Sequence, residues 1–235
     1  MIEIWTFLSH SPLLWLASTL LAYLIGQTIF QLLGQTPAAN PAMIAMILLA
    51  LLLYLTATPY ARYFEGAQFI HFLLGPATVC LALPLYDNLG RVKRAAFPLL
   101  AALLIGSLVG IGSALSIAWA FGLSDQVLTA MAPKSATAAV AIGVAEQIGG
   151  SASLTTLMVT ITGVLGALIA TPFLNLLRIR DYRARGFAVG VAAHGFGTAR
   201  ALQVNPTAGA FAGLGMGLNA LLTAMLAPVV LKFFL

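Results

Sequence analysis

The chain has 235 residues, of which 61% are hydrophobic and only 7% are charged. Soluble domains carry about 25% charged residues, so this composition indicates a membrane protein and excludes an ordinary soluble domain. The net charge of +5 comes from clusters between apolar stretches, which is a signal of membrane topology and not of nucleic-acid binding. A single cysteine, Cys80, excludes an internal disulfide and a thiolate zinc cluster.

The first half of the chain predicts several membrane segments, since a membrane helix needs roughly 20 apolar residues. Three apolar stretches, a polar turn and a long span follow one another at 12–33, 42–57, 69–86, 87–94 and 95–121. Gly75, Pro76 and Pro84 interrupt the third stretch. We therefore expect a broken or irregular element there.

The second half begins with a weaker apolar stretch and contains a second basic turn. Its successive segments are 127–148, 154–176, the basic turn 178–185, 186–201 and 208–231. Pro133 breaks the first of these segments, and glycines crowd the segment that contains His194. Both segments are predicted to be discontinuous helices.

Two basic turns, 91–94 and 178–185, restrict the topology. The positive-inside rule places both on the cytoplasmic face, but three full crossings between them would place them on opposite faces. Either the broken segment 127–148 enters and leaves on one side, or one turn violates the rule; we favour re-entry. The sequence predicts a single all-α polytopic membrane domain over 1–235, with six to eight membrane elements, two of them broken or re-entrant.

A weak internal repeat relates 12–121 to 127–235. The clearest match pairs 75–78 with 195–198, each of which combines glycine with threonine beside a helix break. Corresponding interrupted segments in two halves are typical of transporters, whose substrate sites lie at the repeat interface.

Three cations lie inside apolar stretches beside helix breakers: Lys134, His194 and Arg200. A charge at membrane depth costs several kcal/mol unless it faces a partner or a wet cavity, so such residues indicate a functional site. The alternatives are that Lys134 reaches the headgroups from a helix end, that His194 is a packing residue and that Arg200 anchors a helix end. A titrating His194 that couples protons is a further possibility.

These segments would form a site for a small anion if they faced one cavity. A helix start after Pro133 would present free N–H groups beside an ammonium and two hydroxyls, and the guanidinium fork of Arg200 suits a carboxylate. The predicted binding residues are Lys134, Ser135, Thr137, His194, Gly195, Gly197, Thr198 and Arg200, joined through the repeat by Gly75, Pro76 and Thr78. Metal-ligand spacing, nucleotide loops and paired catalytic carboxylates are absent from the sequence, so we expect no metal, no cofactor and no enzymatic activity.

The segments 72–79, 132–137 and 193–200 resemble the signature segments of the LrgB/CidB family, and the resemblance covers nearly the whole chain. It implies a multi-pass protein of the bacterial inner (cytoplasmic) membrane that acts with a smaller LrgA/CidA-type membrane protein and can self-associate as a homo-oligomer.

The resemblance implies two different functions. One description of the family is a holin-like or antiholin-like modulator of murein hydrolase export and autolysis. Relatives in chloroplasts exchange glycolate and glycerate, and bacterial relatives are linked to pyruvate uptake. The helix breaks with their polar residues favour a carrier of small monocarboxylates of the glycolate, pyruvate or lactate class. The holin-like role and a scaffold for an LrgA-like subunit remain as alternatives.

Overall fold

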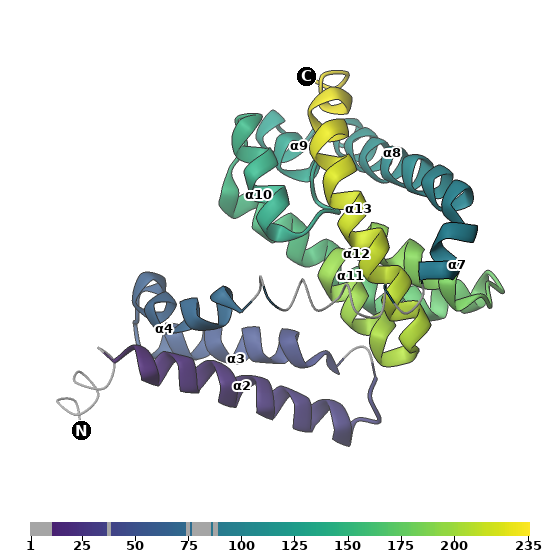
Figure 1. The fold of residues 1–235 in the computed structure, drawn as a ribbon. Coiled ribbons are helices and arrows are strands. Elements are labelled where there is room, and N and C mark those ends of the chain that lie inside the picture. The colour runs from purple at the N-terminus through teal and green to yellow at the C-terminus, as the bar shows by residue number, and fades with distance from the viewer. Residues whose placement is uncertain (1–10, 37–38, 74–75, 77–85, 87–88) are drawn as a thin grey trace. The chain divides into compact units, whose positions relative to one another are not determined.

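The computed structural model describes residues 11–36, 39–73, 76, 86 and 89–235, and its secondary structure there is helical with no strand (Figure 1). Four helices are long and apolar enough to cross a membrane: α2 (Pro12–Leu32), α8 (Ala96–Ala120), α11 (Ala152–Leu176) and α13 (Pro206–Leu231). The predicted all-α membrane fold is confirmed. The number of six to eight membrane elements and the internal repeat stay predictions.

The chain forms two compact units, 1–80 and 81–235. In the first unit, α2 packs against α3 (Pro41–Leu55) through Gly26, where an added Cβ would lie 2.5 Å from the carbonyl oxygen of Pro41. The unit also contains α4 (Tyr60–Phe72), which packs on α2 through a hydrogen bond of 3.1 Å between Thr19 Oγ1 and Tyr63 OH. We did not predict α4 as a helix, because its mixture of charged and aromatic residues breaks the apolar pattern.

The region between the two units is only partly described. Within the predicted stretch 69–86, Gly75 and Thr78 lie outside the described residues, and Pro76 is an exposed helical residue. The predicted polar turn 87–94 ends as a short helix, α7 (Leu89–Arg94). The role of Gly75, Pro76 and Thr78 therefore stays a prediction from the repeat.

In the second unit, the segment 125–150 forms a hairpin. It consists of α9 (Asp125–Met131), a helix break at 132–137 and α10 (Ala138–Gln147), as Pro133 predicted. An added Cβ on Gly150 would lie 3.0 Å from Thr129 Cγ2, so the end of the segment returns to the level of its start. Figure 1 shows α9 and α10 at the same end of this unit.

A second hairpin lies within α12 (Tyr182–Val204). The helix breaks at Ala193 and at His194, whose φ of 38° is in the left-handed region. An added Cβ on Gly197 would lie 2.7 Å from Val189 Cγ1, although eight residues of straight helix span about 12 Å. The second half of α12 therefore folds back along the first half.

Small residues allow this arrangement. Added Cβ atoms on Gly186 and Gly190 of α12 would each lie 2.0 Å from a carbonyl oxygen of α13, those of Ala208 and Ala212. On α11, an added Cβ at Gly163 would lie 2.6 Å from His194 Cε1, so the break in α12 rests on a surface without a side chain. Glycine at these positions permits backbone contact that any larger residue would prevent.

Candidate functional site

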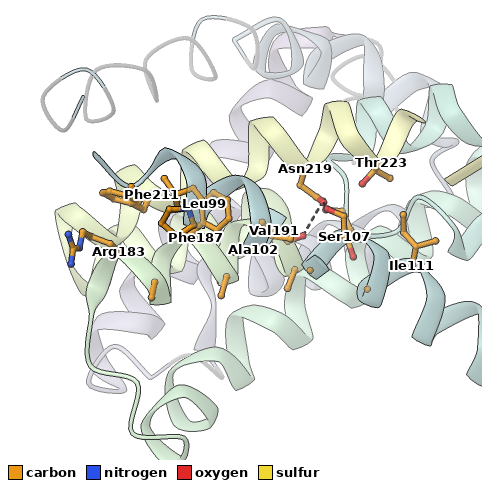
Figure 2. A pocket seen from close by; sticks show the side chains of 18 of the residues that line it. Leu99, Ala102, Ser107, Ile111, Arg183, Phe187, Val191, Phe211, Asn219 and Thr223 are labelled. Carbon is orange, nitrogen blue, oxygen red and sulfur yellow. Dashed lines mark hydrogen bonds between the residues drawn. The ribbon is translucent and has the colours of Figure 1, made fainter. Parts of the chain in front are cut away.

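A cavity of about 570 Å³ lies in the second unit, between α8, α12 and α13 and the break in the α9–α10 hairpin. Figure 2 shows Arg183 at one end of it and Ile111 and Thr223 at the other. Most of the lining is apolar. Its polar side chains are Ser107, Lys134, Ser135, Asp181, Arg183, Asn219 and Thr223.

The outer end of the cavity lies beside both basic segments. Val92, from the first basic segment, packs against a cluster of buried side chains that contains Phe187 of α12. Asp181 forms an ion pair with Arg183, and this guanidinium holds the pKa of the Asp181 carboxyl below its ordinary value. At neutral pH both members of the pair are therefore charged, and together they carry no net charge. The contact between Val92 and Phe187 places both basic segments at one end of the unit, as the positive-inside rule requires.

Lys134 and Ser135 line the cavity from the α9–α10 break. The Lys134 ammonium donates a hydrogen bond of 3.3 Å to Ser135 Oγ, and in the described part of the chain it has no carboxylate partner. No carboxylate other than Asp181 lines the cavity among the described residues. The ammonium is thus a cation in a mostly apolar cavity, without a counter-ion among the residues that the structure describes.

Asn219 of α13 joins the two helix breaks. Its amide Nδ2 donates to the carbonyl oxygens of Ser135 (3.0 Å) and Val191 (3.1 Å), which lie beside the two breaks. Its Oδ1 accepts a hydrogen bond of 2.7 Å from Ser107 Oγ of α8. One buried amide therefore connects both hairpins to α8 and α13 (Figure 2).

His194 does not line the cavity, but it lies near the α9–α10 break, because Val159, to whose carbonyl it is hydrogen-bonded, packs against Ala136. His194 is buried, its Nε2 donates a hydrogen bond of 3.0 Å to the carbonyl oxygen of Val159, and its ring meets that of Phe196 edge-on. The two breaks converge within the unit, and His194 has the contacts of a packing residue at the tip of α12.

The other predicted residues of this region lie outside the cavity lining. Thr198 Oγ1 donates to the carbonyl oxygen of His194 (2.8 Å), and Gly197 packs on Val189. Gly195 is exposed, and Thr137 caps α10 without a side-chain hydrogen bond among the described residues. Their place in a binding site stays a prediction.

Arg200 lies in a different, small pocket that Arg185 also lines. Its Nη1 is 3.4 Å from Gln203 Oε1, with which it forms a hydrogen bond. A straight helix would separate residues 185 and 200 by about 22 Å, so their shared pocket is a further sign that α12 folds back. The fold-back also directs Arg200 away from the cavity that Lys134 lines.

Sequence reasoning missed Ser107, Asn219 and Thr223 as cavity residues. Their one signal in the sequence is a polar side chain inside a long apolar helix. Within the described residues, no group of three His, Cys, Asp or Glu side chains could hold a metal ion.

The family model for the LrgB-like family matches residues 19–233. The chain belongs to the LrgB-like family. Holin-like protein CidB of Staphylococcus epidermidis is 33% identical over 84% of this chain and 86% of that protein. The Staphylococcus aureus protein of the same name is 34% identical over the same shares, and YwbG of Bacillus subtilis is 32% identical over 92% of this chain and 95% of its own. No solved structure matches the chain.

The LrgB-like match extends over both hairpins and all the residues that line the cavity. Together with four candidate membrane spans, it makes the chain a multi-pass membrane protein. The staphylococcal relatives carry a holin-like name, which describes those proteins and identifies neither a solute nor a site.

Proposed function

We propose that this LrgB-like protein is a membrane carrier for small monocarboxylate anions. The observation that supports the proposal is the ammonium of Lys134, which lines a mostly apolar cavity and has no carboxylate partner among the described residues. A partly buried cation without a counter-ion is unfavourable, and an anionic ligand would neutralise it. The cavity volume of about 570 Å³ falls in the range of small-molecule sites and would hold a small acid with water.

The charge balance favours a monoanion. Asp181 and Arg183 cancel each other at the outer end, which leaves the single positive charge of Lys134 along the described lining. One carboxylate would neutralise that charge, whereas a dicarboxylate would bring a second negative charge into an apolar space. Ser135 Oγ, which accepts from the ammonium, can donate its own proton to the same carboxylate.

Transport would require the cavity to open at its other end. There, buried side chains of α8, α9 and α13, among them Leu115, Leu128 and Ala227, pack against one another. Two hairpins that meet at Asn219 would be the moving parts, since discontinuous helices at a central site are typical of carriers with alternating access. In this proposal the described conformation is open toward the basic segments.

Uptake into proteoliposomes tests the proposal directly. The purified protein would be reconstituted and assayed with labelled glycolate, pyruvate and lactate. We expect Lys134→Ala to lower uptake at least tenfold, Lys134→Arg to retain part of it, and the exposed Lys232→Ala to leave it unchanged. Unchanged uptake by Lys134→Ala would rule out Lys134 as the anion site.

A holin-like role is the second candidate, and the names of the staphylococcal relatives favour it. In that role the protein would modulate murein hydrolase export from the bacterial inner membrane, as a homo-oligomer or with an LrgA/CidA-type partner. It predicts an autolysis phenotype that tolerates Lys134→Ala and does not depend on any solute. Assays of uptake and autolysis in the same Lys134→Ala strain separate the two candidates.

A further inference from the structure

Two arginines from opposite halves of α12 line one small pocket of the second unit. Arg185 lies in the first turn of α12 and Arg200 lies in the half that folds back, so the fold-back brings them together. No carboxylate lines this pocket among the described residues, and neither guanidinium takes part in an ion pair there. Because two like charges in one place repel each other, the pocket is a positive site without a counter-ion of its own.

The hydrogen bonds of the two arginines hold them in position without neutralising their charge. Arg185 Nη1 donates to Asn175 Oδ1 (2.8 Å) and to the carbonyl oxygen of Ile179 (3.0 Å). Arg200 Nη1 donates to Gln203 Oε1 (3.4 Å), and its Nε is buried without a partner among the described residues. An anion can therefore reach Arg200 only at its Nη end. Each guanidinium carries five N–H donors, so both keep donors for the oxygens of a phosphate.

The pocket lies at the cytoplasmic boundary of the membrane. The last two turns of α11 contribute to its lining, and α11 is a candidate membrane span that the basic segment 178–185 follows. Val204 of the pocket, and Phe173 and Leu202 beside pocket residues in the chain, are exposed apolar side chains. Such side chains on a membrane protein match the acyl chains of lipid. Two charges next to an acyl-chain surface suit the headgroup of a lipid.

We infer that Arg185 and Arg200 bind the phosphate group of an anionic phospholipid from the cytoplasmic leaflet. The pocket volume of about 20 Å³ is below the share of one liquid water, about 30 Å³, so the pocket cannot enclose a free metabolite. A lipid phosphate needs no enclosure, because it lies at the mouth of the pocket while its acyl chains stay in the bilayer. Arg178 and Arg180, which are exposed, add positive charge nearby and favour a lipid with net negative charge. This site is separate from Lys134 and does not depend on any carried solute.

The test measures the lipid preference of the delipidated full-length protein in detergent. Thermal unfolding is followed during titration with dioctanoyl phosphatidylglycerol, dioctanoyl phosphatidylcholine or inorganic phosphate, and each titration gives an apparent Kd. We expect only phosphatidylglycerol to raise the melting temperature clearly. Arg200→Gln should weaken its binding about tenfold, the factor expected for one charge-assisted hydrogen bond. Arg200→Lys should lose less, because it keeps the charge and loses only the planar fork.

Arg180→Gln is the matched control, since it removes the same charge from the neighbouring basic segment but does not line the pocket. It should change the apparent Kd for phosphatidylglycerol by no more than about twofold. The melting temperature without lipid shows that each variant is folded, and Arg200→Lys carries the test if Arg200→Gln does not fold.

Four outcomes would overturn the inference. Equal losses in Arg180→Gln and Arg200→Gln would show a diffuse attraction of lipid to a basic surface. Equal binding of phosphatidylcholine would show that net negative charge is not recognised. A shift by inorganic phosphate as large as that by phosphatidylglycerol, at the same concentration, would show a site for a soluble anion. Wild-type binding by folded Arg200 variants would show that Arg200 does not hold the phosphate.

Discussion

At the scale of single residues, Asn219 has the most structural consequence. A helix break in an apolar environment leaves backbone carbonyls without partners, and each such group costs several kcal/mol in a bilayer. The amide of Asn219 supplies donors to two of them, one at each hairpin, and its oxygen accepts from Ser107. The amide nitrogen and the amide oxygen of Asn219 are therefore both hydrogen-bonded to other parts of the protein. In the proposed carrier, Lys134 and Ser135 would make the ligand contacts.

Replacement of Asn219 should destabilise the fold more than replacement of its partner. Asn219→Leu leaves the carbonyls of Ser135 and Val191 unpaired, at a cost of about 2–4 kcal/mol in the free energy of unfolding. Ser107→Ala removes one hydrogen bond and should cost about 0.5–1.5 kcal/mol. Reversible denaturation of the purified protein in detergent measures both costs. Equal effects of the two variants would contradict the role assigned to the amide donors.

At the scale of elements, small residues decide how the helices pack. The backbone of α12 approaches that of α13 at Gly186 and Gly190, and α11 receives the break of α12 at Gly163. Lipid supplies no hydrophobic force between helices, so close backbone contact and hydrogen bonds hold them together. The glycine content of these helices is therefore a requirement of their packing.

Gly190→Ala should destabilise the α12–α13 contact, because the added Cβ would lie 2.0 Å from the carbonyl oxygen of Ala212, a backbone atom. We expect a loss of about 1–3 kcal/mol in the free energy of unfolding, the usual cost of overpacking. Gly217→Ala on α13 is the control, since no atom lies within 4 Å of its added Cβ. It should be neutral or stabilising by up to about 1 kcal/mol, because alanine has the higher helix propensity. The same unfolding measurement tests both, and a neutral Gly190→Ala would contradict the close approach of the two helices.

The sequence predicted both helix breaks, because Pro133 and the glycines after His194 are local signals. It could not predict the direction of the chain after His194. Arg200 shows the consequence: on a continuous helix it would have extended the site beyond His194, but the fold-back places it in a pocket with Arg185. The direction of the chain after the break depends on the φ of His194 and on the space that Gly163 of α11 leaves for it. No local sequence pattern predicts either of these features.

At the scale of the whole molecule, only part of the candidate site could be predicted. Lys134 and Ser135 follow from the rule that charge at membrane depth is functional. Ser107 and Thr223 enter the cavity only because α8 and α13 pack together; Ser107 and its partner Asn219 are 112 residues apart in the chain. A polar side chain in an apolar helix is visible in the sequence, but the long-range packing that brings such residues to one cavity is not. The break in the segment 127–148, in contrast, followed from Pro133, and its re-entry, expected from the charge of the two basic turns, stays a prediction.

The arrangement of the second unit predicts which side of the membrane reaches the cavity. Ala188 is exposed in the cavity wall, on the side of the basic segments. Lys232 lies at the opposite end of the unit, because it follows Leu231, which packs with Ala118 at the far end of α8. In a variant with Cys80→Ala, an impermeant maleimide should therefore label Ala188→Cys from the cytoplasmic side and Lys232→Cys from the opposite side. Intact cells and inside-out vesicles provide the two exposures. Labelling of both cysteines from one side would contradict the crossing of α13, because its 26 residues span about 39 Å and separate the two sites by a full bilayer core.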